Sequence, residues 1–504
     1  MKKSISLFLF ITLSITLVAQ NYVIDKSFGE NGVIKYSFAD SANLNIAFNG
    51  YNLGDSYLIQ SFTEPEEEDG YFSFAKFSKT GELDTTYADN GELKIYSINS
   101  DEPVIATILP DKRLVFPRLK EDLSFSIDIY NNDGILEDSF PVSFGDYDVY
   151  TTTIASDDNY IYVGGIFDFN DISKSFIIKT DFKGNFDSSF GDNGIYIFQN
   201  DSIGIELNTF ILQEGNIIVA TNQNYPNTFS NDSLFITKLN SKGEVVSDFG
   251  DNGYIKMENE FEDYLSLLPD KNQNIYVVSF GIPIMFKFDK NGKIDTTFGN
   301  SGIAYYGSLG IEDLNIFFPK LLNDESIILF CASSEDIEES QTTLLKIDTN
   351  GKIDSTFGNY GVKIDYFGGY SAFINGIVED DGSFLALGTQ GIEDAEQNSL
   401  IVKYKPESSA TGDFYKQDFD IKIYPNPITN NDLIIDFDLE QKSNIEIDIF
   451  DMIGNKILNL YQGPGSTGKN SINSHLPFAL NQGIYLIRLK TTQGISTKKI
   501  TVAY

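Results

Sequence analysis

One short motif, Asp-x-x-Phe-Gly-x-x-Gly, recurs along most of the chain and limits what the chain can fold into. Its aromatic residue stands about 55 residues apart at seven positions, which are Phe28, Tyr87, Phe140, Phe190, Phe249, Phe298 and Phe357. The copy at Phe140 is incomplete, because it keeps Asp138-Ser-Phe140 but lacks the closing glycine. Repeats of roughly this length build propellers or solenoids, in which each unit buries its apolar face against the next. The chain therefore has to fold as a closed or open array of similar units.

Each repeat has the pattern of four short β-strands. Alternation such as Phe72-Ser73-Phe74-Ala75, with many Ile, Val, Phe and Tyr, indicates half-buried strands. In five repeats the aromatic stands six residues after a turn glycine, as Tyr87 does after Gly81. This fixed spacing predicts one buried packing anchor per repeat, and the anchors are Phe28, Tyr87, Phe190, Phe249, Phe298 and Phe357.

The two ends of the array are complementary. The last unit has no fourth strand after Leu400–Tyr404, and the chain begins with an unmatched strand at Val33–Phe38. Pairing these two strands closes a ring of seven four-stranded blades and hides the sheet edges. An open solenoid, the alternative, gains nothing from such a split. We therefore predict an all-β protein with a seven-bladed β-propeller at residues 20–405.

The repeats resemble a known family. The repeat motif is similar to the delta-60 repeat of bacterial surface and secreted proteins. The similarity also includes the segment Asp381–Gly388 and the dipeptides Leu345-Lys346 and Ile178-Lys179 within the expected third strands. The resemblance covers most of residues 22–405. It implies a propeller-like array and no established reaction, so it transfers no catalytic residue.

The first nineteen residues have the composition of a secretory signal peptide. Lys2 and Lys3 precede an apolar run from Leu7 to Val18, and the small residue Ala19 is followed by Gln20. This order predicts cleavage between Ala19 and Gln20. The run is too short for a membrane-spanning helix, which needs roughly 20 apolar residues. No other segment is long and apolar enough, so we expect an exported chain without a transmembrane segment.

Composition excludes several function classes. Asp and Glu number 73 against 36 Lys and Arg, a net charge of −37, which repels phosphate backbones and argues against nucleic acid as a partner. The chain has one His, one Cys and no Trp, so HExxH and CxxC metal or redox sites are impossible. We expect Cys331 to be a small buried apolar residue and His475 to lie in a solvated turn.

A second domain follows a polar linker. Residues 406–419 are rich in Ser, Thr, Gly and Asp and interrupt the repeats. Residues 420–504 alternate as short strands, for example at Ile445–Phe450 and Gly483–Leu489. A chain of this length made of short strands predicts a small Ig-like β-sandwich.

The tail also resembles a known family, the type A sorting domain of the type IX secretion system. The resemblance rests on Ile423–Pro427, Ile449–Ile457, Leu480–Leu489 and Lys498–Ile500, which stand in the family's order. The motif residues are Tyr424, Pro425, Asn426, Pro427, Gly454, Gly483, Tyr485 and Lys499. It implies that the type IX machinery is a partner and that the protein crosses the outer membrane of a Bacteroidota-type cell. It further implies that the cargo is attached to the surface or released.

Acidic loops are the remaining candidate binding feature of the propeller. They join the second and third strands of the repeats, and their residues include Glu66, Glu67, Glu68, Asp69, Glu335, Asp336, Glu338 and Glu339. Such loops form either a face for a cation or a basic partner, or a solvated rim that keeps the protein soluble. Asp289–Asp295 and Asp348–Asp354 hint at Ca²⁺ loops but have too few oxygen ligands, so hairpin turns are favoured.

Two classes of function stay open. The first is a secreted or surface propeller that acts, as a monomer without a cofactor, in binding or adhesion to an extracellular protein or glycan. The second is a polysaccharide hydrolase with paired carboxylates in the propeller channel, since such pairs leave no local motif. No catalytic residue can be named from the sequence. A hydrolase needs two carboxyl groups about 5–10 Å apart near the axis, whereas a scaffold carries its charge on loop tips.

Overall fold

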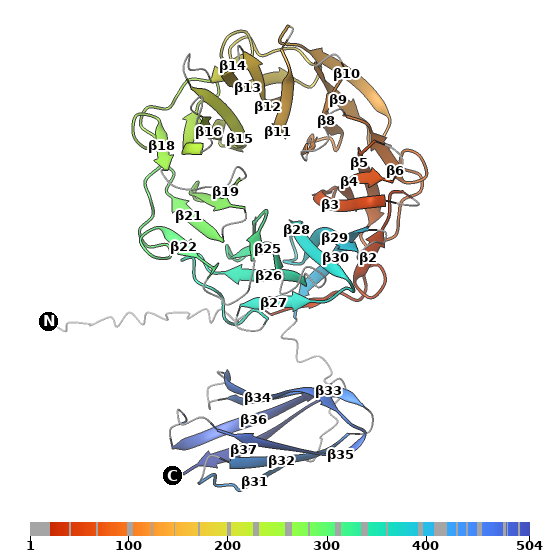
Figure 1. Ribbon diagram of the computed structural model, residues 1–504, viewed down its shortest axis with the longest axis vertical. Coiled ribbons are helices and arrows are strands. Elements are labelled where there is room, and N and C mark those ends of the chain that lie inside the picture. The colour runs from red at the N-terminus through yellow and green to blue at the C-terminus, as the bar shows by residue number, and fades with distance from the viewer. Residues whose placement is uncertain are drawn as a thin grey trace, which may run out of the picture. The chain divides into compact units, whose positions relative to one another are not determined.

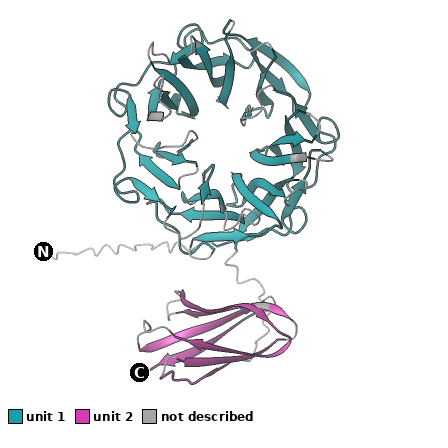
Figure 2. Ribbon diagram, viewed as in Figure 1, with its two compact units in different colours: residues 1–407 teal, residues 408–504 magenta. Residues whose placement is uncertain are grey.

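The structure is a computed structural model, and it divides the chain into two compact units, residues 1–407 and 408–504 (Figure 2). Each unit is all-β. The residues that the structure describes are 21–39, 42–66, 69–97, 104–121, 124–145, 147–169, 172–198, 203–224, 231–257, 265–280, 283–307, 314–333, 341–358, 361–391, 397–407, 421–429, 432–439, 442–450, 456–476, 480, 482–491 and 494–503. Within these ranges no helix is long and apolar enough to cross a membrane.

The described part of the first unit forms seven antiparallel sheets, numbered here in chain order, which follow one another around a ring (Figure 1). Sheet 1 contains β3(Ala42–Asn52), β4(Ser56–Pro65), β5(Tyr71–Ser78) and β6(Glu92–Ile95), and sheet 2 contains β7(Thr107–Ile108), β8(Leu114–Leu119), β9(Phe125–Tyr130) and β10(Leu136–Val142). Sheet 3 contains β11(Val149–Ser156), β12(Tyr160–Phe169), β13(Ile172–Asp181) and β14(Ile195–Phe198), and sheet 4 contains β15(Gly204–Gln213), β16(Asn216–Asn224), β17(Asn231–Leu239) and β18(Tyr254–Met257). Sheets 5 and 6 are β19(Leu265–Pro269), β20(Ile275–Ser279), β21(Ile284–Phe288) and β22(Ile303–Tyr305); and β23(Asn315–Ile316), β24(Lys320–Leu321), β25(Ile327–Ser333), β26(Gln341–Ile347) and β27(Val362–Asp365). Where Figure 1 labels the first strand of a sheet, as for β3, β11, β15, β19 and β28, that strand lies toward the middle of the ring.

Sheet 7 contains both ends of the first unit. Its strands β28(Tyr370–Val378), β29(Phe384–Gly391) and β30(Asn398–Pro406) are joined by β1(Tyr22–Ile24) and β2(Val33–Tyr36) from the start of the chain. Along β30, Val402 lies opposite Val33 and Tyr404 lies opposite Ile24. The N-terminal segment thus takes the position that a hairpin and a fourth strand take in the other sheets.

Three details of this junction differ from the sequence prediction. The closing strand ends at Tyr36 rather than Phe38, and the pairing of β1 was not predicted at all. The predicted linker start at Pro406 is also wrong, because Pro406 lies opposite Tyr22 and the Glu407 amide donates to the Asn21 carbonyl at 2.6 Å. A three-residue strand carries too little alternation to be recognised in a sequence.

The repeat motif connects neighbouring sheets. The six predicted anchors are buried, with exposed fractions from 0% to 3%. The glycine after the anchor donates its amide to the turn of the next sheet, as Gly29 does to the Thr80 carbonyl at 2.8 Å and Gly250 to that of Asn291 at 2.7 Å. The anchor's ring also meets the next sheet's turn glycine, since a Cβ on Gly351 would lie 2.7 Å from Cζ of Phe298. The turn glycine that contacts Tyr87, Phe190, Phe249 and Phe298 therefore belongs to the next repeat along the chain.

Sheet 2 departs from this plan. The chain passes from the turn at Gly134 straight into β10, a strand of seven residues, without the motif's intervening loop. Phe140 still takes the anchor's place, because a Cβ on Gly184 of sheet 3 would lie 2.3 Å from its Cγ. Ile129 stands on β9 where other repeats have a lysine, and the neighbouring Asp128 lies 2.7 Å from Arg118 Nε.

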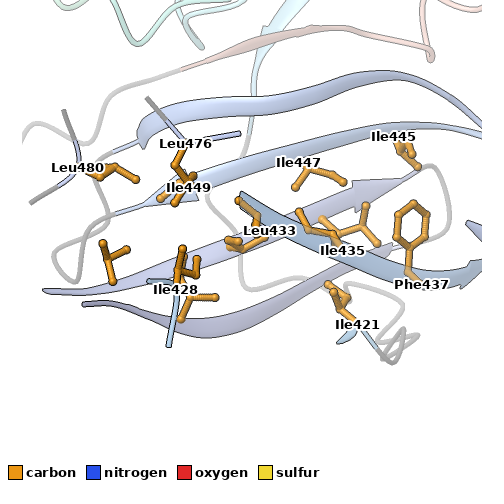
Figure 3. Packing of buried hydrophobic residues seen from close by; sticks show 14 of the residues in the cluster. Ile421, Ile428, Leu433, Ile435, Phe437, Ile445, Ile447, Ile449, Leu476 and Leu480 are labelled. Atoms are coloured by element: carbon orange, nitrogen blue, oxygen red, sulfur yellow. The ribbon is translucent and has the colours of Figure 1, made fainter. Parts of the chain in front are cut away.

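The second unit consists of two packed sheets. One contains β31(Lys422–Tyr424), β32(Asp432–Leu439) and β35(Gly468–His475), and the other contains β34(Lys456–Gly465), β33(Ser443–Phe450), β36(Gly483–Thr491) and β37(Gly494–Val502). Alternate residues of β33, namely Ile445, Ile447 and Ile449, point into one apolar core with Leu433 and Ile435 of β32 (Figure 3). This core is separate from those of the ring.

Candidate functional site

The acidic loops lie partly in the described residues. Glu64, Glu66 and Asp69 are exposed where β4 gives way to β5. The other predicted acidic residues, Glu67, Glu68, Glu335, Asp336, Glu338 and Glu339, lie outside the described residues. In the described part of the chain no group of three His, Cys, Asp or Glu side chains could hold a metal ion.

The described first strands of the sheets carry little charge. Among the described residues, the first strands of the seven sheets contain one carboxyl group, Glu206, and no amine, and Lys320 lies on β24, the short strand that follows β23 in sheet 6. Burial lowers the pKa of Lys320 to about 8. The described first strands are therefore poor in carboxyl groups.

The aspartates of the two suspected Ca²⁺ loops accept backbone hydrogen bonds within hairpin turns. Asp289 Oδ1 accepts hydrogen bonds from the backbone amides of Asn291 and Lys293, both at 2.9 Å. Asp348 Oδ1 accepts the same pair of bonds from Asn350 and Lys352. These are hairpin turns closed by an aspartate side chain, as the sequence favoured.

A lysine stands at one equivalent position on the third strand of six sheets, and the burial of five of these lysines was not foreseen. These residues are Lys76, Lys179, Lys238, Lys287, Lys346 and Lys403. Four of them contact the first residue of their own repeat motif: Lys76 Nζ lies 3.3 Å from Asp84, Lys179 2.8 Å from Asp187, Lys287 3.4 Å from Asp295 and Lys346 3.2 Å from Asp354. The ammonium groups also lie near aromatic rings, for example 4.1 Å from the centroid of Tyr160 for Lys179.

The junction between sheets 7 and 1 holds a further ion-pair cluster. Glu379 of sheet 7 lies 2.8 Å from Nζ of Lys403 and 2.5 Å from Nζ of Lys79, which belongs to sheet 1. Lys79 in turn covers the ring of Tyr57, at 3.8 Å from its centroid. Burial raises the pKa of Glu379, but hydrogen bonds from Lys403, Lys79 and Tyr57 outweigh it and lower that pKa to about 2. Charges 300 residues apart in sequence thus meet where the ring closes.

In the second unit, the first motif fastens the start of the domain to its last strand. Asn426 donates from Nδ2 to the Lys499 carbonyl at 3.1 Å, and its Oδ1 accepts from the Thr501 amide at 2.9 Å. The Tyr424 hydroxyl donates to the carboxylate of Asp436 on β32. Pro425 and Pro427 flank Asn426 in cis peptide bonds.

The remaining motifs meet on one pair of strands. Gly483 begins β36 opposite Val502, and Tyr485 lies opposite Ile500. Lys499 is exposed on β37, and Gly454 lies outside the described residues. The structure therefore brings the first, third and fourth motifs together around β37.

Comparison with known families decides what this unit is. The model of the secretion system C-terminal sorting domain matches residues 422–503. The tail is a sorting domain. The predicted resemblance to type IX sorting domains is thereby confirmed, and the protein is exported to the cell surface or the medium. No curated protein matches the chain, and the delta-60 resemblance of the repeats stays a prediction.

Solved structures with some likeness to the chain are distant. A subtype N10 neuraminidase-like protein of A/little yellow-shouldered bat/Guatemala is 14% identical, with a TM-score of 0.36 over 59% of this chain and 93% of that one. A subtype N11 neuraminidase-like protein of A/flat-faced bat/Peru is 10% identical, with a TM-score of 0.34 over 78% and 99%. A glycoside hydrolase is 10% identical, with a TM-score of 0.25 over 69% and 95%. Likeness this weak carries no conclusion about activity.

The sorting domain contains a buried carboxylate that the sequence did not reveal. Asp448 faces outward from β33, yet its side chain is fully covered. It contacts Arg488 Nη2 at 3.1 Å, Lys456 Nζ at 3.0 Å and Asn459 Nδ2 at 2.8 Å. Burial raises the pKa of Asp448, but the bonds from Asn459 and Lys456 outweigh it, so the pKa lies below its usual range. Alternation along β33 predicts that an outward-facing side chain is exposed to solvent, so only the structure shows that the Asp448 carboxylate is covered.

The two residues singled out for their rarity have structural places. His475 ends β35 of the sorting domain instead of lying in a turn, so that expectation is wrong; it is exposed, and its Nδ1 lies 2.7 Å from Asp432. Cys331 is fully buried on β25, as predicted. Burial raises the pKa of its thiol, so the group stays protonated.

Proposed function

We propose that the protein is an exported seven-bladed β-propeller that acts by binding an extracellular partner. The ring of seven sheets, with its first and last strands side by side, supports the propeller assignment. The chain is then a signal peptide cleaved before Gln20, a propeller of delta-60 type and an Ig-like sorting domain over residues 420–504. The mature protein works as a monomer.

One observation carries the choice of binding over catalysis. The described first strands hold a single carboxyl group, Glu206, where a hydrolase needs two that are about 5–10 Å apart. The exposed carboxylates Glu64, Glu66 and Asp69 instead stand at the end of the β4–β5 hairpin. A face of solvated charge on short loops suits recognition of a basic protein patch or a cation-bridged glycan.

The test is a binding screen of the purified full chain on glycan and protein arrays. Changing Glu64→Gln, Glu66→Gln and Asp69→Asn together should weaken capture of the partner at least tenfold and leave the thermal unfolding midpoint unchanged, because solvated charges contribute little to stability. A matched control changes Glu82→Gln and Asp158→Asn, exposed acids in turns at the other ends of the strands, and should bind normally. Equal binding by all three proteins, or hydrolysis of an arrayed polysaccharide, would contradict the proposal.

A further inference from the structure

The chain leaves the ring from an interior strand of sheet 7. On one side β30 pairs with β29, from Asn398 to Tyr404, and on the other side it pairs with β1 and β2 of the N-terminal segment, residues 21–36. The bonds to that segment extend past the ladder, because the Glu407 amide donates to the Asn21 carbonyl at 2.6 Å. The stretch of chain that leads to the sorting domain therefore starts at the end of a strand with partners on both sides.

The position of this exit is a consequence of closure by β1 and β2. In sheet 1 the chain continues past its third strand to the outer strand β6, which pairs with β5. A pull on such an outer strand peels it off one residue pair at a time. A pull on β30 has to break the ladders on both of its sides. Closure by the N-terminal segment therefore moves the exit from the edge of a sheet to its interior.

Side chains fasten the N-terminal segment beside the exit. Tyr22 is 2% exposed, and the centroid of its ring lies 5.1 Å from that of Phe384 and 6.0 Å from that of Phe357, the anchor of sheet 6. Lys405 Nζ lies 2.8 Å from Asp25. The segment is thus tied to the last residues of β30 and to the neighbouring sheet as well.

The direction of β30 sets how a pull on the exit loads these contacts. Lys403 donates from Nζ to the Tyr57 hydroxyl at 3.0 Å, and the Ser399 hydroxyl donates to that of Ser61 at 3.0 Å. β30 and β4 therefore run in opposite directions. Since the acidic loop follows the end of β4, the exit end of β30 lies at the opposite end of the strands. A pull between the acidic loop and the exit thus runs along the strands.

We propose that sheet 7 is a mechanical clamp, in which β30 bears load in shear between β29 and the N-terminal segment. The inference rests on the proposed function, because the load arises when a partner held on the acidic loops pulls against the sorting-domain side of the chain. In shear all residue pairs along β30 are loaded at once, so the barrier to forced opening is higher than in peeling. Such a clamp suits adhesion at the cell surface, where partner and cell are pulled apart.

The test pulls the purified chain, from residue 20 to its C-terminus, with optical tweezers in two geometries. In the first, the handles are attached at Asp69→Cys, in a Cys331→Ala background, and at a C-terminal tag, so the pull runs along β30. In the second, they are attached at an N-terminal tag and the same C-terminal tag, so the pull peels Tyr22 from Pro406. The force that opens the ring should be at least about threefold higher in the first geometry, since forced opening follows the unfolding barrier. The sorting domain lies in series in both geometries, so its unfolding step is a shared reference.

A pair of core variants shows which contacts bear the load. Tyr22→Ala removes the ring that packs against Phe384 and Phe357, so it should roughly halve the opening force in the first geometry. Phe298→Ala removes a fully buried ring from sheet 5, away from the loaded strand, and should leave that force unchanged. The comparison of the two geometries needs neither variant, so it stands even if Tyr22→Ala does not fold.

Two results would overturn the clamp: equal opening forces in the two geometries, or equal weakening by Tyr22→Ala and Phe298→Ala. Covalent handles replace the partner, so the outcome does not depend on what binds the acidic loops. A partner screen without a loop-dependent hit would refute the proposed function and leave the measured forces as they are. Equal forces would refute the clamp and leave the result of the screen intact.

Discussion

At the scale of single residues, the anchors explain why the repeat motif is so regular. Phe298 is fully buried, and Tyr276 meets its ring edge-on with centroids 5.6 Å apart. The Cζ end of the Phe298 ring meets the turn glycine of the next sheet, Gly351. The sequence allowed the anchors to be predicted because each stands in the repeat motif, and five of them follow a turn glycine at a constant distance. Their partners could not be predicted, because contacts between repeats leave no local pattern.

Removing one anchor should therefore destabilise the ring. Phe298→Ala should lower the free energy of unfolding by about 3–5 kcal/mol, since it deletes a fully buried ring and leaves a cavity. The measurement is chemical denaturation of the purified chain. Tyr305→Ala, at a tyrosine that is 59% exposed, is the control and should cost little. A loss below about 1 kcal/mol for Phe298→Ala would mean that the ring is no anchor.

The turn glycine should be equally intolerant of a side chain. Gly351→Ala forces a Cβ within 2.7 Å of Phe298 and strains a φ of +77°. Gly215 has a similar φ of +75° and nothing within 4 Å of its Cβ position, so Gly215→Ala carries the strain alone. We expect Gly215→Ala to cost about 1 kcal/mol and Gly351→Ala about 2–4 kcal/mol in the same denaturation experiment. Equal costs would refute the inter-sheet contact.

At the scale of elements, the closing sheet shows what sequence reasoning could and could not reach. The partner of Val33–Tyr36 could be predicted, because an unmatched strand at one end needs a sheet that lacks one at the other. The cluster around Glu379 could not, because Lys79 lies 300 residues away and only the closed ring brings the two together. The acidic loops were visible as composition, but composition does not say what they bind.

The Glu379 cluster should make ring stability depend on acid pH. Its pKa falls from an ordinary 4.5 to about 2, so its contribution is fully present above about pH 4.5 and is lost as the pH falls toward 2. We expect a loss on the order of 2 kcal/mol that is absent in Glu379→Gln. The measurement compares the free energy of unfolding at pH 5 and pH 3. Glu82→Gln, an exposed acid, should keep the wild-type slope, and an unchanged slope in Glu379→Gln would contradict the assignment.

At the scale of the whole molecule, the chain combines a closed ring of sheets with a sorting domain. The sorting domain directs export, and the ring, held at its seam by β1 and β2, presents the loops outside the cell. Closure by the N-terminal strand means that the propeller is complete only once both ends of residues 21–407 have met. Such a seam removes the exposed sheet edges on which a secreted repeat protein would otherwise aggregate.

The most direct test of this closure is a disulfide across the seam. Val33 lies opposite Val402, so Val33→Cys with Val402→Cys, in a Cys331→Ala background, should oxidise quantitatively to one intramolecular disulfide. Mass spectrometry of the non-reduced peptides would identify it, and the cross-link should raise the thermal unfolding midpoint. The pair Val33→Cys with Val277→Cys, a residue of sheet 5, is the control and should stay reduced. The account predicts the Val33–Val402 cross-link; its absence, or an equally efficient Val33–Val277 cross-link, would contradict a ring closed by its N-terminal strand.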